Sequence, residues 1–367
     1  MKFTCNTEAL YEACINVSRA ISNKTNIPVL EGVLFKTTEQ GLSLTGYDLD
    51  LGIFTTIEAM IIEDGEIVLE AKIISEILRC LEDDKVSFET DSRNVCRITS
   101  GVSIYNINGM GTEEYPELPY TYGENDIILN QKVFGDMIRQ TVFAVSLDDA
   151  RVAHRGVKFE ISHGDIKAIA LDGYRFAMRH EMIDYKGEDI SFIVPAKSLN
   201  EITKFVTDDD GMISLSPDEK YMRVGINGYN IVSRLLDGDF MDYKRIIPTD
   251  FETEVHIKSS LLLDKLQSMA ILADDRIKSP VRCTFKDDEL FFNINSKNGE
   301  ADTKMDVEMT GAEIEIGFNI RYLSDAVRAS DGDKIKMCLS SPIKPVVIKP
   351  LEGDSYFYLV LPVRFRN

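Results

Sequence analysis

The sequence predicts an α+β protein of three similar domains, each with two helices packed on antiparallel sheets. Three observations predict this class. The chain has 367 residues, which suits two to four domains of roughly 100–200 residues each. Strand-like and helix-like patterns follow one another in the same order three times, and equivalent residues recur at spacings of 124 and 125 residues. The predicted domains are 1–121, 122–248 and 249–367.

The clearest repeated feature is a strand-like segment that runs directly into a helix-like one. Its three copies are 66–78, 191–202 and 315–326. Lys72, Lys197 and Arg321 hold equivalent positions, and an acidic residue follows four positions later each time. A second repeat places Gly32 and Gly156 in similar strand-like segments 124 residues apart. Duplication for stability alone would also produce such repeats, so the repeat by itself does not define a function.

Each copy is expected to run strand, helix, strands, helix, strands. The six expected helices are 7–21, 72–81, 131–145, 197–206, 258–273 and 321–330. In the first, Leu10, Cys14, Val17 and Ile21 recur on one face at helical spacing, and Thr7 is the expected N-cap.

The segments between these helices alternate apolar and polar residues, as strands do. Clear examples are 41–45 and 289–294. The pairs Asn227-Gly228 and Asp237-Gly238 predict turns. The longest apolar run, 356–363, is far too short to span a membrane and predicts a buried strand instead.

Composition narrows the class of protein. The chain carries 61 acidic and 41 basic residues, a net charge of −20. This charge argues against nucleic-acid binding over the whole surface but not against a local basic surface.

The first residues contain no apolar signal region, so the cytoplasm is the expected compartment. Six dispersed cysteines, among them Cys14 and Cys80 in helix-like patterns, are expected to be reduced core residues.

Cations recur seven residues apart in five of the six expected helices. The pairs are Lys72/Arg79, Lys132/Arg139, Lys197/Lys204, Lys258/Lys265 and Arg321/Arg328. Seven residues are nearly two helical turns, so both members of a pair point the same way. Any one pair could belong to an ordinary solvated helix face with local ion pairs. The whole set favours a shared basic surface that contacts phosphates without reading sequence.

The motifs of common enzymes are missing from the sequence. The four histidines show no zinc spacing, no nucleotide-binding glycine loop is present, and there is no nucleophile elbow. The acidic runs at 148–149, 208–210 and 274–275 lie where helix ends and turns are expected. We therefore expect no catalytic residue, metal or cofactor, although a repeat-built acidic hydrolase or metal enzyme stays an alternative.

Several segments together identify a family. They are TGYDLD at 45–50, ALDGYRF at 170–176, DGDFMDYKRIIP at 237–248, GAEIEIGFN at 311–319 and YLVLPVR at 358–364. From end to end, the chain resembles the β subunit of bacterial DNA polymerase III, the sliding clamp.

The resemblance implies the DNA clamp fold and a head-to-tail homodimer closed into a ring of six domains, with helices lining the hole. Such a ring encircles duplex DNA without sequence specificity and acts as a processivity factor in DNA replication. Lys24, Lys72 and Arg79 match DNA-facing positions of the family. Since the chain has no ATP motif, a separate clamp loader would have to open the ring.

The resemblance also implies a pocket between the second and third domains. It receives short linear motifs from the replicative polymerase, the clamp loader, repair polymerases and ligase-type factors. The matching positions are His154, Leu171, Gly173, Tyr174, Arg175, Phe176, Met241, Arg245, Ile246, Asn319, Tyr322, Ile343, Pro345, Val360, Leu361, Pro362, Val363 and Arg364. His154-Arg155, Tyr174 and Phe176 depart from the usual pattern, so the preferred motif is expected to differ.

The implied subunit interface involves Tyr105 and Ile107 on one side and Ile271 and Leu272 on the other. A repeat-built adaptor that binds only proteins is the remaining alternative. Charge reversal at the helix cations separates the two hypotheses, because an adaptor would keep its partners and a clamp would lose processive synthesis.

Overall fold

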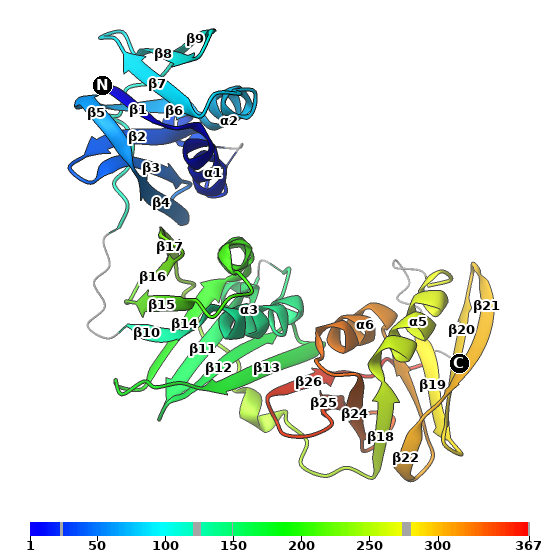
Figure 1. Cartoon of the computed structure of the whole chain (residues 1–367). Coiled ribbons are helices and arrows are strands. Elements are labelled where there is room, and N and C mark those ends of the chain that lie inside the picture. The colour runs from blue at the N-terminus through cyan, green and yellow to red at the C-terminus, as the bar shows by residue number, and fades with distance from the viewer. Residues whose placement is uncertain (23–24, 120–125, 149, 274–279, 366–367) are drawn as a thin grey trace. The chain divides into compact units, whose positions relative to one another are not determined.

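The computed structural model describes residues 1–22, 25–119, 126–148, 150–273 and 280–365 (Figure 1). These residues form two compact units. One contains residues 1–132 and 197–235, and the other contains residues 133–196 and 236–367. The threefold division at residues 121 and 248 stays a prediction.

The first unit contains two antiparallel sheets. The five-stranded sheet has the order β5 (Ala59–Glu63), β1 (Lys2–Asn6), β7 (Lys85–Thr90), β8 (Val95–Ser100) and β9 (Ser103–Asn108). The eight-stranded sheet has the order β10 (Ile127–Asn130), β15 (Met212–Pro217), β16 (Tyr221–Ile226), β17 (Tyr229–Arg234), β4 (Leu51–Ile57), β3 (Gly41–Tyr47), β2 (Gly32–Thr38) and β6 (Glu66–Glu70). Pairing of β17 with β4 joins strands from the first and second thirds of the chain.

Helices α1 (Thr7–Ser18) and α2 (Ala71–Arg79) pack against each other in this unit, and α1 lies on β3 and β4 (Figure 1). Leu10, Cys14 and Val17 are buried, as their spacing predicted, whereas Ile21 lies beyond the end of α1 and is half-buried. The N-cap prediction was wrong by one residue. Asn6 accepts from the backbone N–H of Ala9, whereas the Thr7 hydroxyl donates to the carbonyl of Asp83.

The second unit also contains two antiparallel sheets. The larger has the order β14 (Ile190–Pro195), β11 (Gly156–Ser162), β12 (Asp165–Leu171), β13 (Arg175–Met182), β26 (Tyr356–Val360), β25 (Val346–Pro350), β24 (Lys334–Leu339), β18 (Thr253–Lys258) and β22 (Glu308–Gly311). The smaller has the order β21 (Gly299–Asp306), β20 (Glu289–Ser296), β19 (Val281–Lys286) and β23 (Ile314–Phe318). Strand β26 confirms the buried strand that the longest apolar run predicted.

Four further α-helices complete the chain, so each of the six expected helices has a counterpart among the described residues. They are α3 (Gln131–Arg139), α4 (Ala196–Ile202), α5 (Ser259–Ala270) and α6 (Ile320–Ala329). Several are shorter than predicted. The chain continues in 3-10 turns after α3, at η2 (Val142–Ala144), and after α4, at η4 (Thr203–Phe205). Helices α5 and α6 pack side by side (Figure 1).

The repeated glycines have a packing reason. Gly32 and Gly156 begin the equivalent strands β2 and β11. A Cβ atom at these positions would come within 2.9 Å of the Leu69 carbonyl oxygen and 2.3 Å of the Val194 carbonyl oxygen. These distances are too short for any side chain, so the neighbouring strand requires glycine at both places.

Candidate partner pocket and basic surface

The second unit contains a surface cavity of about 560 Å³. It is lined by Val145, Ser146, Leu147, Asp148, Arg151, Asp172, Gly173, Tyr174, Arg175, Met241, Arg321 and Tyr322. Among these, the predicted pocket residues are Gly173, Tyr174, Arg175, Met241 and Tyr322. The fold therefore brings one part of the predicted pocket together from three separate stretches of sequence.

A tight turn between β12 and β13 presents one wall of the cavity. The Asp172 carboxylate accepts from the backbone N–H groups of Tyr174 and Arg175, at 2.8 and 3.0 Å. Gly173 has a φ of +89°, a conformation that side-chain-bearing residues rarely adopt. The carbonyl of Tyr174 accepts from the N–H of Leu361 at 2.9 Å, which ties the turn to the segment after β26.

Arg175 connects this turn to helix α6. Its guanidinium lies 3.0 Å from the Asp172 carboxylate and 2.7 Å from the Asp325 carboxylate. It also lies over the Tyr322 ring, 4.6 Å from the centroid. Only 9% of the Arg175 side chain is exposed. Buried charge-assisted bonds of this kind depend on geometry, so Arg175 holds Tyr322 in place.

Two aromatic rings and a helix cap complete this region. Tyr174, 53% exposed, stacks on Tyr322 with 5.9 Å between centroids. Asn319 precedes α6 and its side chain accepts from the N–H groups of Arg321 and Tyr322. Asn319 is thus an N-cap that fixes the start of the helix carrying Tyr322.

The other predicted pocket residues do not line this cavity. Ile246, Ile343, Leu361 and Arg364 are exposed, Pro345, Pro362 and Val363 are half-buried, and Arg245 forms an exposed ion pair with Asp242. Leu171 and Phe176 belong to a buried core cluster with Tyr243 and Leu359, and Val360 is fully buried.

His154, predicted to lie in the partner pocket, is instead buried in the interior. It is 5% exposed and its ring meets Phe240 edge-on at 5.2 Å. Burial lowers the pKa of His154, and the charge of Arg151 lowers it further. Both effects favour the neutral imidazole, so His154 packs as a neutral ring in the interior.

One wall of the cavity was not predicted from the sequence, the residues Val145–Asp148 together with Arg151. The expected helix 131–145 was extended too far, which hid the loop that follows it. Leu147 is 87% exposed. An apolar residue between a helix end and an acidic run was the available signal, but a single exposed leucine is common on protein surfaces and does not mark a site by itself.

Most of the predicted DNA-facing cations fall into two groups. Lys72, Arg79, Lys132 and Arg321 are exposed and have no carboxylate partner within the described ranges. Five more have carboxylate partners, which are Asp331 for Arg139, Asp48 for Lys197, Glu201 for Lys204, Asp333 for Lys258 and Asp325 for Arg328.

Three members differ from the simple helical pattern. Lys258 ends strand β18 and precedes α5, and Lys265 is half-buried and donates to the Thr303 hydroxyl at 3.0 Å. Lys204 lies in the 3-10 turn η4. Lys24 lies outside the described residues.

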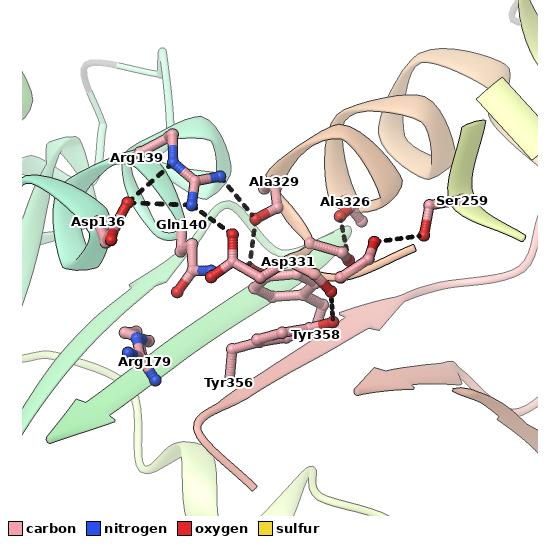
Figure 2. Close-up of polar contacts among 12 residues, drawn as sticks. Asp136, Arg139, Gln140, Arg179, Ser259, Ala326, Ala329, Asp331, Tyr356 and Tyr358 are labelled. Carbon is pink, nitrogen blue, oxygen red and sulfur yellow. Dashed lines mark hydrogen bonds and ion pairs between the residues drawn. The ribbon is translucent and has the colours of Figure 1, made fainter. Parts of the chain in front are cut away.

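The Arg139 side chain is exposed, but contacts with neighbouring groups of the protein hold it in place. Figure 2 shows its guanidinium directed at Asp136, Asp331 and the carbonyl of Ala329, at 3.1, 2.6 and 3.1 Å. Gln140 also donates to Asp331, and Tyr358 donates to the same Ala329 carbonyl. Arg139 therefore ties α3 to the carboxyl end of α6, where a cation is favoured by the helix dipole.

The predicted subunit interface lies at sheet edges. Tyr105 and Ile107 are half-buried on β9, an edge strand of the five-stranded sheet. Ile271 is 79% exposed after α5, which packs on the edge strand β21. The neighbouring Leu272 carbonyl accepts from the Ser296 hydroxyl. Unpaired strand edges can accept a strand from another chain.

The described part of the chain holds no group of three or more metal-binding side chains. Asp149, Asp274 and Asp275, from the acidic runs, lie outside it.

All six cysteines are free, and burial raises the pKa of Cys5 to about 12. Cys80 is exposed, so its prediction as a core residue was wrong. Within the described ranges, no helix is long and apolar enough to cross a membrane.

The comparisons with known proteins agree along the whole chain. Family models for the N-terminal, central and C-terminal domains of the DNA polymerase III beta subunit match residues 1–119, 128–242 and 244–364. These matches define a three-domain α+β protein of the sliding-clamp class. The chain belongs to the DNA polymerase III beta subunit family.

Individual relatives and solved structures are similar over nearly their full lengths. The beta sliding clamp of Bacillus subtilis strain 168 is 30% identical over 378 residues, covering 99% of this chain and 100% of the relative. The crystal structure of the Bacillus subtilis DNA polymerase sliding clamp has a TM-score of 0.96 at 28% identity, with 100% of both chains covered. A putative DNA polymerase III beta subunit from Eubacterium rectale has a TM-score of 0.95 at 30% identity, covering 100% of this chain and 99% of the other.

Proposed function

We propose that the chain is a DNA sliding clamp and processivity factor that encircles duplex DNA as a head-to-tail homodimeric ring. The observation that carries this proposal is the similarity to the Bacillus subtilis clamp structure over the complete length of both chains. The exposed cations Lys72, Arg79 and Lys132 would make weak, sequence-independent contacts to phosphates, which permit sliding. The role requires no bond chemistry, so the protein would not be an enzyme.

The cavity beside Tyr174 and Tyr322 would tether partners. Exposed apolar side chains next to oriented polar groups suit a short peptide, because a few buried anchors supply most of the affinity of such complexes. The replicative polymerase, the clamp loader, repair polymerases and ligase-type factors would bind there through linear motifs. The protein would work in the cytoplasm, where its DNA and partners are.

Retention on circular DNA tests the enclosing ring. The full-length protein, loaded onto nicked circular duplex by a clamp loader, should stay bound through gel filtration, and cutting the circle once should release it. An open binding protein would dissociate equally from both forms. Equal loss from circular and linear DNA would therefore refute the ring.

The subunit interface can be tested without DNA. Ile271→Glu places a charge on the exposed apolar residue beside β21 and should shift the protein from dimer to monomer in analytical ultracentrifugation. Met60→Glu is the matched control, because Met60 is also exposed, at 63%, but lies on β5 at the opposite edge from β9. A dimer that tolerates Ile271→Glu would refute the proposed interface.

A further inference from the structure

We propose that the free edge of strand β5 (Ala59–Glu63) in the first unit is a docking site for a basic, extended segment of a partner protein, which binds there as an added strand. β5 ends the five-stranded sheet and pairs only with β1 among the described residues. Figure 1 shows it at the margin of the first unit. The site shares no residue with the cavity of the second unit or with the set of helix cations, so it is a further attachment point.

The backbone of β5 is open to another strand. An edge strand presents alternate N–H and carbonyl groups that no neighbouring strand satisfies, and folded proteins commonly block such edges with lysine or proline. The edge strand β21 carries Lys304 and the edge strand β14 ends at Pro195. The sequence of β5 is AMIIE, which contains neither residue. Strand addition is therefore physically available at β5.

The side chains of β5 offer apolar contact area to an added strand. Met60 and Ile62 are 63% and 54% exposed. Because side chains alternate along a strand, both lie on the same face of the sheet. Single exposed apolar residues need no explanation, but these two are neighbours on one face of a strand whose edge is free. They can contact alternate side chains of an added strand.

A surface groove of about 540 Å³ borders β5. Residues 38–41, in the turn between β2 and β3, line it together with residues of β5 and its two ends. The acids Glu39, Glu58 and Asp64 belong to the lining, and no lysine or arginine of the described chain does. Glu39 and Glu58 are exposed and have no ion-pair partner among the described residues. Asp64 accepts from the Thr37 hydroxyl at 3.2 Å, which leaves its charge unbalanced.

This charge determines the kind of partner. Lysine or arginine side chains on an added strand would lie near three unbalanced carboxylates, whereas the phosphates of DNA would be repelled. A second copy of this chain is disfavoured as well. Antiparallel pairing of two β5 edges would bring Glu58 of each copy toward Glu63 of the other, and like charges across a strand pair are destabilising. The occupant is therefore a basic segment of a different protein.

Fluorescence anisotropy with the full-length protein tests the proposal. The probe is a labelled peptide of alternating valine and lysine with both ends blocked, and the comparison peptide carries glutamate in place of lysine. The lysine peptide should bind about tenfold more tightly at low salt, and the difference should shrink as salt screens the charges.

Backbone methylation tests whether the peptide binds as a strand. Two further forms of the lysine peptide are methylated on alternate backbone nitrogens, one form on the valines and the other on the lysines. Alternate N–H groups of a strand point to opposite edges, so only one form keeps the donors that face β5. One form should bind like the unmethylated peptide and the other should not bind.

Matched variants locate the site. Ile62→Lys places a blocking charge on β5, and Ile104→Lys places the same charge on β9, at the opposite edge of the sheet, where Ile104 is 52% exposed. The first should weaken binding of the lysine peptide about tenfold and the second should not. Glu39→Gln with Glu58→Gln should weaken it about fivefold.

The acids need a control of their own because the whole protein is acidic. Glu8→Gln with Glu12→Gln removes the same charge from exposed positions of α1 and should have little effect on the lysine peptide. Equal effects of the two double variants, or of Ile62→Lys and Ile104→Lys, would place the peptide elsewhere and overturn the inference. Equal binding of the lysine and glutamate peptides, or of both methylated forms, also overturns it. A lower oligomeric state of Ile62→Lys in analytical ultracentrifugation would assign the edge to a second copy and refute the partner segment.

Discussion

The guanidinium of Arg139 lies 2.6 Å from the carboxylate of Asp331 and 3.1 Å from the carbonyl of Ala329 (Figure 2). These contacts join α3 to the end of α6, two helices that each carry a pair of cations at the same spacing. Arg139 is therefore placed to hold the second unit together, and its charge is partly neutralised before any phosphate approaches.

Replacing Arg139 should lower stability. We expect Arg139→Ala to reduce the free energy of unfolding by about 1 kcal/mol, a small value because both side chains are about half exposed and water screens the pair. Urea denaturation measures the change. Asp331→Asn should have less effect in the Arg139→Ala background than alone. Lys132→Ala, on the same helix but without a carboxylate partner in the described ranges, should be nearly neutral, and an equal loss there would contradict the assignment.

Arg175 should matter more than Arg139 because its ion pairs are buried. Arg175→Met leaves Asp172, 11% exposed, without its cation and leaves Asp325, 20% exposed, with only its pair to Arg328. The change should cost roughly 3 kcal/mol of stability in urea denaturation. Arg245→Met is the matched control, since its pair with Asp242 is exposed and should contribute less than about 1 kcal/mol. Similar losses for both variants would refute the role of Arg175 as a buried clamp.

The lowered pKa of Glu160 predicts that the free energy of unfolding depends on pH. Burial alone would raise its pKa from 4.5, but hydrogen bonds from Lys158 and from the Tyr243 hydroxyl, 2.8 Å away, outweigh burial and lower the pKa. Folding therefore favours the charged carboxylate. The stabilisation is present above pH 4.5 and disappears as the pH falls through the lowered folded value.

Tyr243→Phe removes one of these donors. We expect a loss of about 1 kcal/mol at pH 7, and the difference from the unmodified protein should shrink between pH 5 and pH 3 in urea denaturation series. A difference that stays constant with pH would show that the hydroxyl stabilises the fold in some way other than through the charge of Glu160.

The exposed cations that have no carboxylate partner among the described residues should dominate contacts with DNA. Lys72→Gln with Arg79→Gln should shorten retention on circular DNA and flatten its dependence on salt, because two phosphate contacts are lost. Lys204→Gln with Arg328→Gln removes the same charge from sites already paired with Glu201 and Asp325, and the effect should be smaller. Equal effects would mean that local ion pairs do not decide which cations meet DNA.

The repeat and the order of its elements could be predicted from sequence because they depend on local spacing. Leu10, Cys14 and Val17 recur at helical intervals, and they form the buried face of α1. The turn at Asn227-Gly228 has positive φ at both residues, as that pair predicts. Helix ends were predicted less well. The hydrophobic pattern continues past Arg139 into Val142–Ala144, where the chain forms a 3-10 turn.

The sequence by itself determined the α+β class, the threefold repeat and the membership of a family, because these follow from the order of residues along the chain. The tertiary structure decided which cations are paired and which side chains line a cavity. Lys197 meets Asp48 and Arg139 meets Asp331 from far apart in sequence, while Arg321 faces a cavity built from distant segments. The physical reason is that charge pairing and burial depend on distances in space, which only the packing of distant segments sets.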